Sequence, residues 1–180
     1  MFTGQHYSSN LKDVIWEAFD LPEPTKVINN IDKAGSHAEQ IAAMMIGSEK
    51  AFIDLNSDIV LVCGDANTNF ATGVAARKLN ISLGHVESGL RSHDWSMPEE
   101  HNRVMLDHIS DYLFAPTKLS ANNCIKENVM GKVVTTGNTV VDAAQYIKNH
   151  HKQKAPQNFC LNKGFGIFTM HRQELSLIHI

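Results

Sequence analysis

The segment Gly84-His-Val-Glu-Ser-Gly-Leu-Arg-Ser92, followed closely by Met97-Pro-Glu-Glu-His-Asn-Arg103, decides the fold of this 180-residue chain. An apolar run predicts a strand that ends just before Glu87. Pro98 predicts the first turn of a helix that begins with two glutamates. A strand end beside a helix N-terminus brings carboxylates and arginines together, which suits proton transfer next to a phosphorylated ligand.

Strands and helices alternate along the rest of the chain. Short apolar runs predict strands at 58–63, 81–86, 112–115 and 132–136, and helical spacing of apolar residues predicts helices at 10–19, 36–50, 67–79, 98–110, 120–127 and 140–152. The run at 58–63 has no apolar–polar alternation, which predicts a strand buried on both faces. This order predicts a three-layer, Rossmann-like α/β fold, in which four strands are parallel neighbours: those containing Val60, Leu83, Phe114 and Val134.

The composition excludes several classes of protein. With a net charge of −3 and no block of lysine or arginine, the chain is unsuited to a nucleic-acid surface. It has no run of about 18 apolar residues to span a membrane, and its first residues lack the pattern of a signal peptide. Cys63, Cys124 and Cys160 are odd in number and far apart, which favours a reducing compartment over a disulfide framework. These features predict a cytoplasmic protein without nucleic-acid or membrane partners.

Polar residues follow several of the predicted strands. Gln5-His6, Asp65, Glu87, Asn138 and His171 each come just after an apolar run. The carboxyl ends of parallel strands line the ligand crevice of open α/β sheets. We therefore expect these side chains at one edge of the sheet.

Some of the polar positions have a structural alternative. Asp65 also suits a turn before a helix, and Glu99 and Glu100 also suit the positive end of a helix dipole. His85 fits a hydrogen-bonded core histidine better than a catalytic one. Glu87 is harder to explain structurally, because a glutamate between Gly-His-Val and Ser-Gly is not a turn-forming choice.

Three histidines raise the question of a metal site. His101 and His108 are seven residues apart on one predicted helix, and His93 precedes it, but no third ligand stands at a usual spacing. Scattered surface histidines explain them better, so we predict no metal. The chain also lacks a dinucleotide-binding glycine fingerprint and a Gly-Lys-Ser/Thr phosphate loop.

An ordered set of motifs carries a resemblance to a known family. The two segments quoted first are joined by others, and all of them follow the family's order: Thr3–His6, Gly35-Ser36 with Glu39-Gln40, Val62–Asp65 with Asn67-Thr68, Ala115–Thr117, Gly137–Thr139 with Asp142, and His171-Arg172 with Glu174. The chain resembles the non-hydrolysing UDP-N-acetylglucosamine 2-epimerases over residues 1 to about 174. The resemblance implies the N-terminal half of a two-domain GT-B-type fold.

The resemblance also implies a reaction. The family is expected to interconvert UDP-N-acetylglucosamine and UDP-N-acetylmannosamine by eliminating UDP and adding it back, with no cofactor. By motif match, Asp65, Glu87 and Glu99 are the acid/base and charge-stabilising candidates. A UDP-sugar is the implied partner, and a homodimer is the implied assembly of the full-length enzyme.

Further residues are assigned by the same match. His171 and Arg172 correspond to contacts with the nucleotide phosphates, and Arg91 and Asn138 are further substrate-binding candidates. Arg91, like Arg103, also suits pairing with Glu99 and Glu100. The Gln5-His6 segment corresponds to one that helps bind a second, activating UDP-N-acetylglucosamine in some bacterial members.

Two other functions stay open. One is a related nucleotide-sugar enzyme, either a 2-epimerase of a diacetamido uronic acid or a glycosyltransferase of similar two-domain fold. The other is a non-catalytic nucleotide-sugar-binding module. The segments that would separate these are absent from the chain.

The ends depart from the family pattern. We expect residues 1–152 to form a Rossmann-like domain without its first strand and its Gly-Thr/Ala-Arg-Pro-Glu phosphate loop. Residues 153–164 are expected to be a linker and 165–180 the start of a second domain, with 175–180 foreign to the family. We therefore expect the chain alone to express poorly and to be inactive.

Overall fold

The computed structural model describes residues 1, 3, 15–28, 31 and 35–150. The chain forms two compact units, residues 1–147 and 148–180. Only residues 148–150 of the second unit are described, so the expected linker and second domain lie outside the described residues. The elements that follow the first helical turn at 15–18 are α2 (His37–Leu55), β1 (Ile59–Cys63), α3 (Asn67–Lys78), β2 (Ser82–Val86), α4 (Pro98–Ile109), β3 (Tyr112–Ala115), α5 (Lys118–Lys126), β4 (Lys132–Thr135) and α6 (Thr139–His150).

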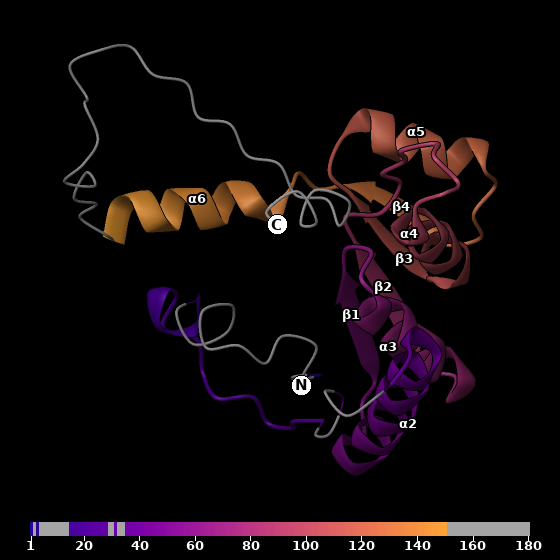
Figure 1. The fold of residues 1–180 in the computed structure, drawn as a ribbon. Coiled ribbons are helices and arrows are strands. Elements are labelled where there is room, and N and C mark those ends of the chain that lie inside the picture. The colour runs from indigo at the N-terminus through magenta and orange to yellow at the C-terminus, as the bar shows by residue number, and fades with distance from the viewer. Residues whose placement is uncertain (2, 4–14, 29–30, 32–34, 151–180) are drawn as a thin grey trace, which may run out of the picture. The chain divides into compact units, whose positions relative to one another are not determined.

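The four strands form one parallel sheet in the order β1-β2-β3-β4 (Figure 1). Val60 lies opposite Leu83 across β1 and β2, and Phe114 lies opposite Val134 across β3 and β4. β2 pairs in parallel with β3 between them. The predicted parallel α/β fold is confirmed, including the adjacency of all four strands.

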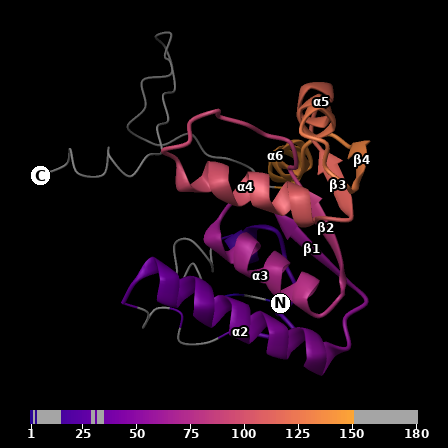
Figure 2. The same cartoon turned by 90° about the vertical axis from the view of Figure 1, so that its right-hand side faces the viewer.

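Helices α3, α4 and α5, which connect successive strands, lie on the same side of the sheet (Figures 1 and 2). This follows from the strand order, because right-handed crossovers between consecutive parallel strands all return over the same face. α2 packs on the outside of α3. α3 is thus enclosed, and its buried residues are small: Ala71, Thr72, Gly73, Ala75 and Ala76.

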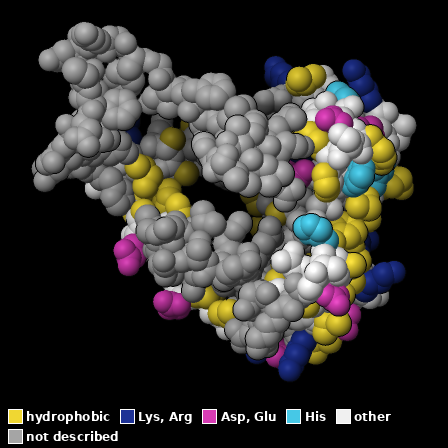
Figure 3. All heavy atoms as spheres, viewed as in Figure 1, with side chains coloured by type: hydrophobic (Ala, Val, Ile, Leu, Met, Phe, Trp, Pro, Cys, Tyr) yellow, Lys and Arg dark blue, Asp and Glu magenta, His cyan; other side chains and the backbone are white. Residues whose placement is uncertain are grey.

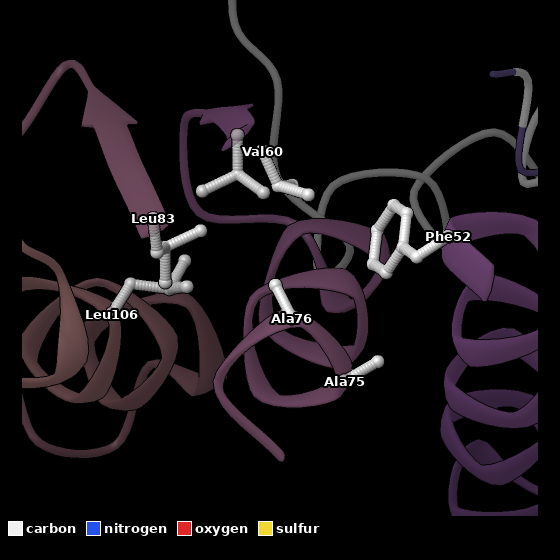
Figure 4. Close-up of a cluster of buried hydrophobic side chains, with 7 residues drawn as sticks. Phe52, Val60, Ala75, Ala76, Leu83 and Leu106 are labelled. Carbon is white, nitrogen blue, oxygen red and sulfur yellow. The ribbon is translucent and has the colours of Figure 1, made fainter. Parts of the chain in front are cut away.

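The core lies between α3 and its neighbours. Phe52 from α2, Val60 from β1 and Leu106 from α4 belong to one cluster of buried side chains around the alanines of α3 (Figure 4). A Cβ on Gly73 would lie 2.6 Å from Leu106 Cδ2. The absence of a side chain at this position is what lets α3 and α4 approach each other.

The opposite face of the sheet carries exposed apolar side chains. Ile59 is 50% exposed and Leu61 60% exposed, whereas Val60 and Val62 between them are buried. The sequence-based prediction that this strand is buried on both faces therefore differs from the structure. Successive side chains point to opposite faces, and α3 covers only one of them. Hydrophobic side chains also lie among charged ones and histidines on the visible surface (Figure 3).

Helix boundaries follow the capping residues. Ser36 accepts a hydrogen bond from the Glu39 N–H at 3.2 Å, as the predicted capping box requires, and α2 runs to Leu55, five residues further than expected. α5 begins at Lys118 instead of residue 120, because Thr117 caps it by accepting from the Ser120 N–H. In the described part, no helix is both long and apolar enough to cross a bilayer.

Candidate active site

Asp65 and Glu87 adjoin each other at the carboxyl edge of the sheet. β1 and β2 end together, because Cys63 lies opposite Val86, and the Gly64 N–H donates to the Val86 carbonyl at 3.0 Å. Each strand is followed directly by a residue in the left-handed conformation, with φ of +81° at Gly64 and +68° at Glu87. A Cβ on Gly64 would lie 3.3 Å from Glu87 Oε2. The Glu87 carboxylate therefore lies against the backbone that leads into Asp65.

The turn that carries Asp65 is held by side chains from three elements. Asn69 Nδ2 donates to the Cys63 carbonyl at 2.5 Å, and Asn102 Nδ2 donates to the Asp65 carbonyl at 2.8 Å. Between them, His85 Nε2 lies 3.1 Å from the Gly64 carbonyl oxygen. These side chains come from α3, β2 and α4. The backbone of the turn is therefore fixed at every residue.

Arg103 holds the carboxylate of Asp65. Its Nη2 donates to Asp65 Oδ2, and its Nη1 donates to Glu100 Oε2 at 2.7 Å. Burial by itself lowers the pKa of Arg103, but hydrogen bonds and charge attraction to Asp65 and Glu100 outweigh it and raise the pKa above its usual value. Asp65 thus faces a permanent positive charge.

Glu100 has a structural role in the first turn of α4. Its side chain is 2% exposed and accepts hydrogen bonds from the Ser92 N–H at 3.0 Å and the His93 N–H at 2.9 Å. Burial alone raises the pKa of Glu100, but these backbone donors and Arg103 outweigh it and lower the pKa to about 2. The neighbouring Glu99 is exposed, and within the described ranges it makes no hydrogen bond or ion pair.

Asn138 links the end of β4 to Glu87. Its Nδ2 donates to Glu87 Oε1 at 2.8 Å, and its Oδ1 accepts from the Val140 N–H at 2.9 Å. The second contact satisfies a free N–H at the start of α6. Asn138 is thereby oriented with its amide group toward the carboxylate, and Glu87 keeps a neutral partner where Asp65 has a cation.

Arg91 points into the protein. Its side chain is 2% exposed and pairs with Asp107 at 2.7 Å and with Glu127 at 2.6 Å. Its Nη1 also donates to the carbonyl of the preceding residue at 2.7 Å. The pairing alternative therefore describes Arg91 better than substrate binding, but its partners are not the expected Glu99 and Glu100. Glu100 pairs with Arg103 instead.

Other predicted site residues lie elsewhere. Gln5, His6, His171 and Arg172 are outside the described residues. His101 Nε2 is 2.9 Å from the Trp95 carbonyl oxygen, and His108 Nε2 is 3.9 Å from a Glu127 oxygen. Within the described part of the chain, no three His, Cys, Asp or Glu side chains group as metal ligands. Cys63 and Cys124 are free thiols, and Cys160 is not described.

Sequence reasoning included the pairing of Arg103 with Glu100 but missed Asp107 on the same face of α4. Glu100, Arg103 and Asp107 are separated by three and four residues, so they lie on one side of the helix. Glu100 and Asp107 are buried, and Asn102 of the same helix binds the Asp65 turn. The available signal was the spacing of these three charged residues, which places them on one side of the predicted helix.

Comparison with known proteins identifies the family. A family model described as UDP-N-acetylglucosamine 2-epimerase matches residues 1–178. The chain belongs to this epimerase family. The match continues past residue 174, where the sequence motifs ended, and includes most of the segment expected to be foreign.

Individual relatives agree with this assignment. The UDP-N-acetylglucosamine 2-epimerase of Methanococcus maripaludis is 43% identical over 178 residues, which cover 96% of this chain and 48% of that protein. The UDP-2,3-diacetamido-2,3-dideoxy-D-glucuronate 2-epimerase of Pseudomonas aeruginosa is 32% identical over 175 residues, covering 96% of this chain and 48% of that protein. The chain thus spans about half the length of these epimerases.

A solved structure supports the fold. The UDP-GlcNAc 2-epimerase of Methanocaldococcus jannaschii, in complex with UDP-GlcNAc and UDP, is 45% identical, with a TM-score of 0.78. The superposition covers 84% of this epimerase-family chain and 42% of that one. The parallel sheet and its connecting helices are therefore those of the N-terminal half of such an enzyme.

Proposed function

We propose that this chain forms the N-terminal half of the catalytic cleft of a UDP-N-acetylglucosamine 2-epimerase. The observation that carries the proposal is the juxtaposition of Asp65 and Glu87 at the carboxyl edge of the sheet, inside the segments that match the family. The ligand crevice of open α/β sheets lies at this edge.

The reaction proceeds by elimination and addition. The C2 proton of the sugar is not adjacent to a carbonyl, so its simple removal leaves no stabilised carbanion. Loss of that proton together with cleavage of the C1–O bond instead gives UDP and 2-acetamidoglucal, with a double bond between C1 and C2. UDP then adds back to C1 while a proton is delivered to the other face of C2. No metal or organic cofactor takes part.

The three carboxylates have different surroundings that suit different roles. Asp65 is held by Arg103 and presents a fixed negative charge, which suits stabilisation of positive charge developing at C1. Glu87 has a neutral amide partner, and Glu99 has no partner within the described ranges; both suit proton transfer at C2. The proposed overall reaction does not depend on which of the two glutamates is the base.

The remaining assignments rest on the family match. His171 and Arg172 would contact the phosphates, and Gln5 and His6 would belong to an activating nucleotide-sugar site. Asn138 orients Glu87, and Arg91 acts through internal ion pairs instead of touching the substrate. We expect a homodimeric enzyme that works in the cytoplasm on sugar nucleotides for polysaccharide synthesis.

The test is an epimerisation assay on a full-length enzyme that contains this sequence. Proton NMR of the anomeric signals follows UDP-N-acetylglucosamine and, in parallel, UDP-2,3-diacetamido-2,3-dideoxy-D-glucuronate. We expect conversion of the first to the manno epimer, unchanged by a chelator. Conversion of only the diacetamido substrate would show that the enzyme is the related 2-epimerase. Conversion of neither substrate would contradict the proposal.

A further inference from the structure

His85 is a buried ionisable residue that the proposed reaction does not use. It lies on β2, two residues before Glu87, and is 0% exposed. Its Nδ1 is 2.7 Å from Asp107 Oδ1, and its Nε2 is 3.1 Å from the Gly64 carbonyl oxygen. The ring therefore bridges α4 and the turn after β1.

Both partners of the ring accept hydrogen bonds. A carbonyl oxygen cannot donate, so Nε2 must carry a proton to bond Gly64. Asp107 Oδ2 accepts from the Gly89 N–H at 2.9 Å and lies 2.7 Å from Arg91 Nη2, so this carboxylate already serves as an acceptor for two other donors. Nδ1 must then donate to Asp107 as well. The contacts of His85 fit an imidazolium with two N–H groups.

The surrounding charges balance this cation. Asp107 and Glu127 supply two negative charges, and Arg91 and His85 supply two positive ones. From α5, the Cys124 thiol lies 3.9 Å from Asp107 Oδ2. Burial first, and then the Asp107 charge, raise the pKa of Cys124 to about 11, so the thiol stays neutral. Buried charges are tolerated when they are paired in this way.

The contact to Gly64 fixes the backbone next to a catalytic candidate. The Gly64 carbonyl belongs to the peptide that leads into Asp65, and Gly64 adopts the left-handed conformation that this turn needs. Asn102 and Arg103 hold Asp65 from α4, and His85 holds the same turn from the sheet. Loss of the His85 contact would free the Gly64–Asp65 peptide to rotate.

We propose that His85 is a positioning residue for Asp65 and holds the Gly64–Asp65 peptide as a doubly protonated imidazolium neutralised by Asp107. The effect on rate rests on the proposed epimerase function. The protonation state and the backbone contact do not, so they are tested without any substrate.

The first test is NMR of a full-length enzyme that contains this sequence, with isotopically labelled histidine, glycine and aspartate, at neutral pH and without substrate. We expect both ring nitrogens of His85 to show nitrogen shifts and one-bond couplings typical of N–H groups. His85→Gln assigns the signals by removing them, and His37→Gln, at an exposed histidine on α2, is the control. A ring with one bare nitrogen overturns the proposed cation.

The second test uses two variants that each keep one of the two contacts. The amide nitrogen of His85→Gln stands near the position of Nε2 and can reach Gly64, whereas that of His85→Asn stands near Nδ1 and reaches only Asp107. We expect the Gly64 carbonyl and Asp65 amide signals to stay in place in His85→Gln and to move in His85→Asn. Equal displacement in both variants overturns the positioning role.

The same two variants can be compared by steady-state kinetics in the full-length enzyme. We expect His85→Asn to lower kcat at least about tenfold with KM changed less than about threefold, and His85→Gln to recover most of that loss, because small displacements of catalytic groups lower rates strongly. Equal kcat values in the two variants contradict the proposal. An inactive wild type contradicts the epimerase function instead, and the NMR comparison still decides the role of His85.

Discussion

Asp65 and Glu87 follow neighbouring strands, but their carboxylates meet different partners. Arg103 gives Asp65 a permanent cation, whereas Asn138 gives Glu87 a neutral amide. A carboxylate held by a cation suits charge stabilisation, whereas one oriented by a neutral amide suits proton transfer. This difference makes Glu87 the better candidate for moving a proton at C2.

Glu87→Gln in the full-length enzyme should separate rate from affinity. A proton-transfer group acts mainly in the transition state, so kcat should fall about 100-fold or more while KM changes little. Steady-state kinetics measure both, and Glu49→Gln, at an exposed glutamate of α2, serves as the matched control. Normal turnover by Glu87→Gln would show that the role assigned to Glu87 is wrong.

Arg103→Lys tests whether one guanidinium must hold two carboxylates. A lysine ammonium keeps the charge but cannot reproduce the planar fork that reaches Asp65 and Glu100 together. We expect Arg103→Lys to lower kcat about tenfold. Arg103→Gln also leaves Glu100 buried without its cation, so we expect it to lower kcat and, in addition, to lower the free energy of unfolding by about 3 kcal/mol. Kinetics and urea denaturation of both variants check this, and unchanged stability in Arg103→Gln would contradict it.

At the level of elements, α4 connects the site to the fold. Its first turn holds the loop at 92–93 through Glu100, its middle holds Asp65, and Asp107 one turn later holds the network around His85. The same helix buries Leu106 against α3. A shift of α4 would therefore disturb packing and site together.

The acid stability of the chain should depend on Glu100. Its pKa is lowered from 4.5 to about 2 in the folded protein. Because the folded-state pKa lies below the unfolded one, the ionised Glu100 stabilises the fold at pH values above about 4.5, and this stability is lost as the pH falls toward about 2. The contribution to the free energy of unfolding is on the order of 3 kcal/mol. Urea denaturation at a series of pH values should show this loss in the wild type and a shallower one in Glu100→Gln. Glu99→Gln, at the exposed neighbour, should keep the wild-type slope; equal slopes in all three proteins would refute the assignment.

Sequence patterns predicted which segments form helices and strands better than they predicted the burial and the boundaries of those elements. The run at residues 59–62 identified β1 correctly, but an all-apolar run does not reveal which face has a helix over it, and α3 covers only one. The start of α5 was missed because Thr117, a good capping residue, precedes the apolar positions. Capping hydrogen bonds set such helix boundaries, and the spacing of hydrophobic residues does not reveal them directly.

Partners of charged side chains were the harder part of the site. Arg91 is near Glu99 and Glu100 in sequence, yet the fold turns it inward to Asp107 and Glu127. The pairing of Asp65 with Arg103 joins residues 38 positions apart. Strand ends can be predicted to share an edge, but which cation reaches which carboxylate depends on helix rotation and on the loops between them.

For the molecule as a whole, the proposed function makes the described domain one wall of a catalytic cleft. Asp65 and Glu87 lie at one edge of a sheet whose strand order and register are fixed, and the chain spans about half the length of its relatives. In the proposed reaction, the side chains at this edge invert a sugar carbon by removing and returning a proton.

Deuterium uptake from solvent is the most direct test of this proton transfer. The full-length enzyme is incubated with UDP-N-acetylglucosamine in D₂O, and NMR follows C2 of both epimers. We expect deuterium to enter C2 in the manno product and in the recovered substrate, and we expect Glu87→Gln to slow both exchanges together. Epimerisation without deuterium at C2, or exchange at the wild-type rate in Glu87→Gln, would contradict it.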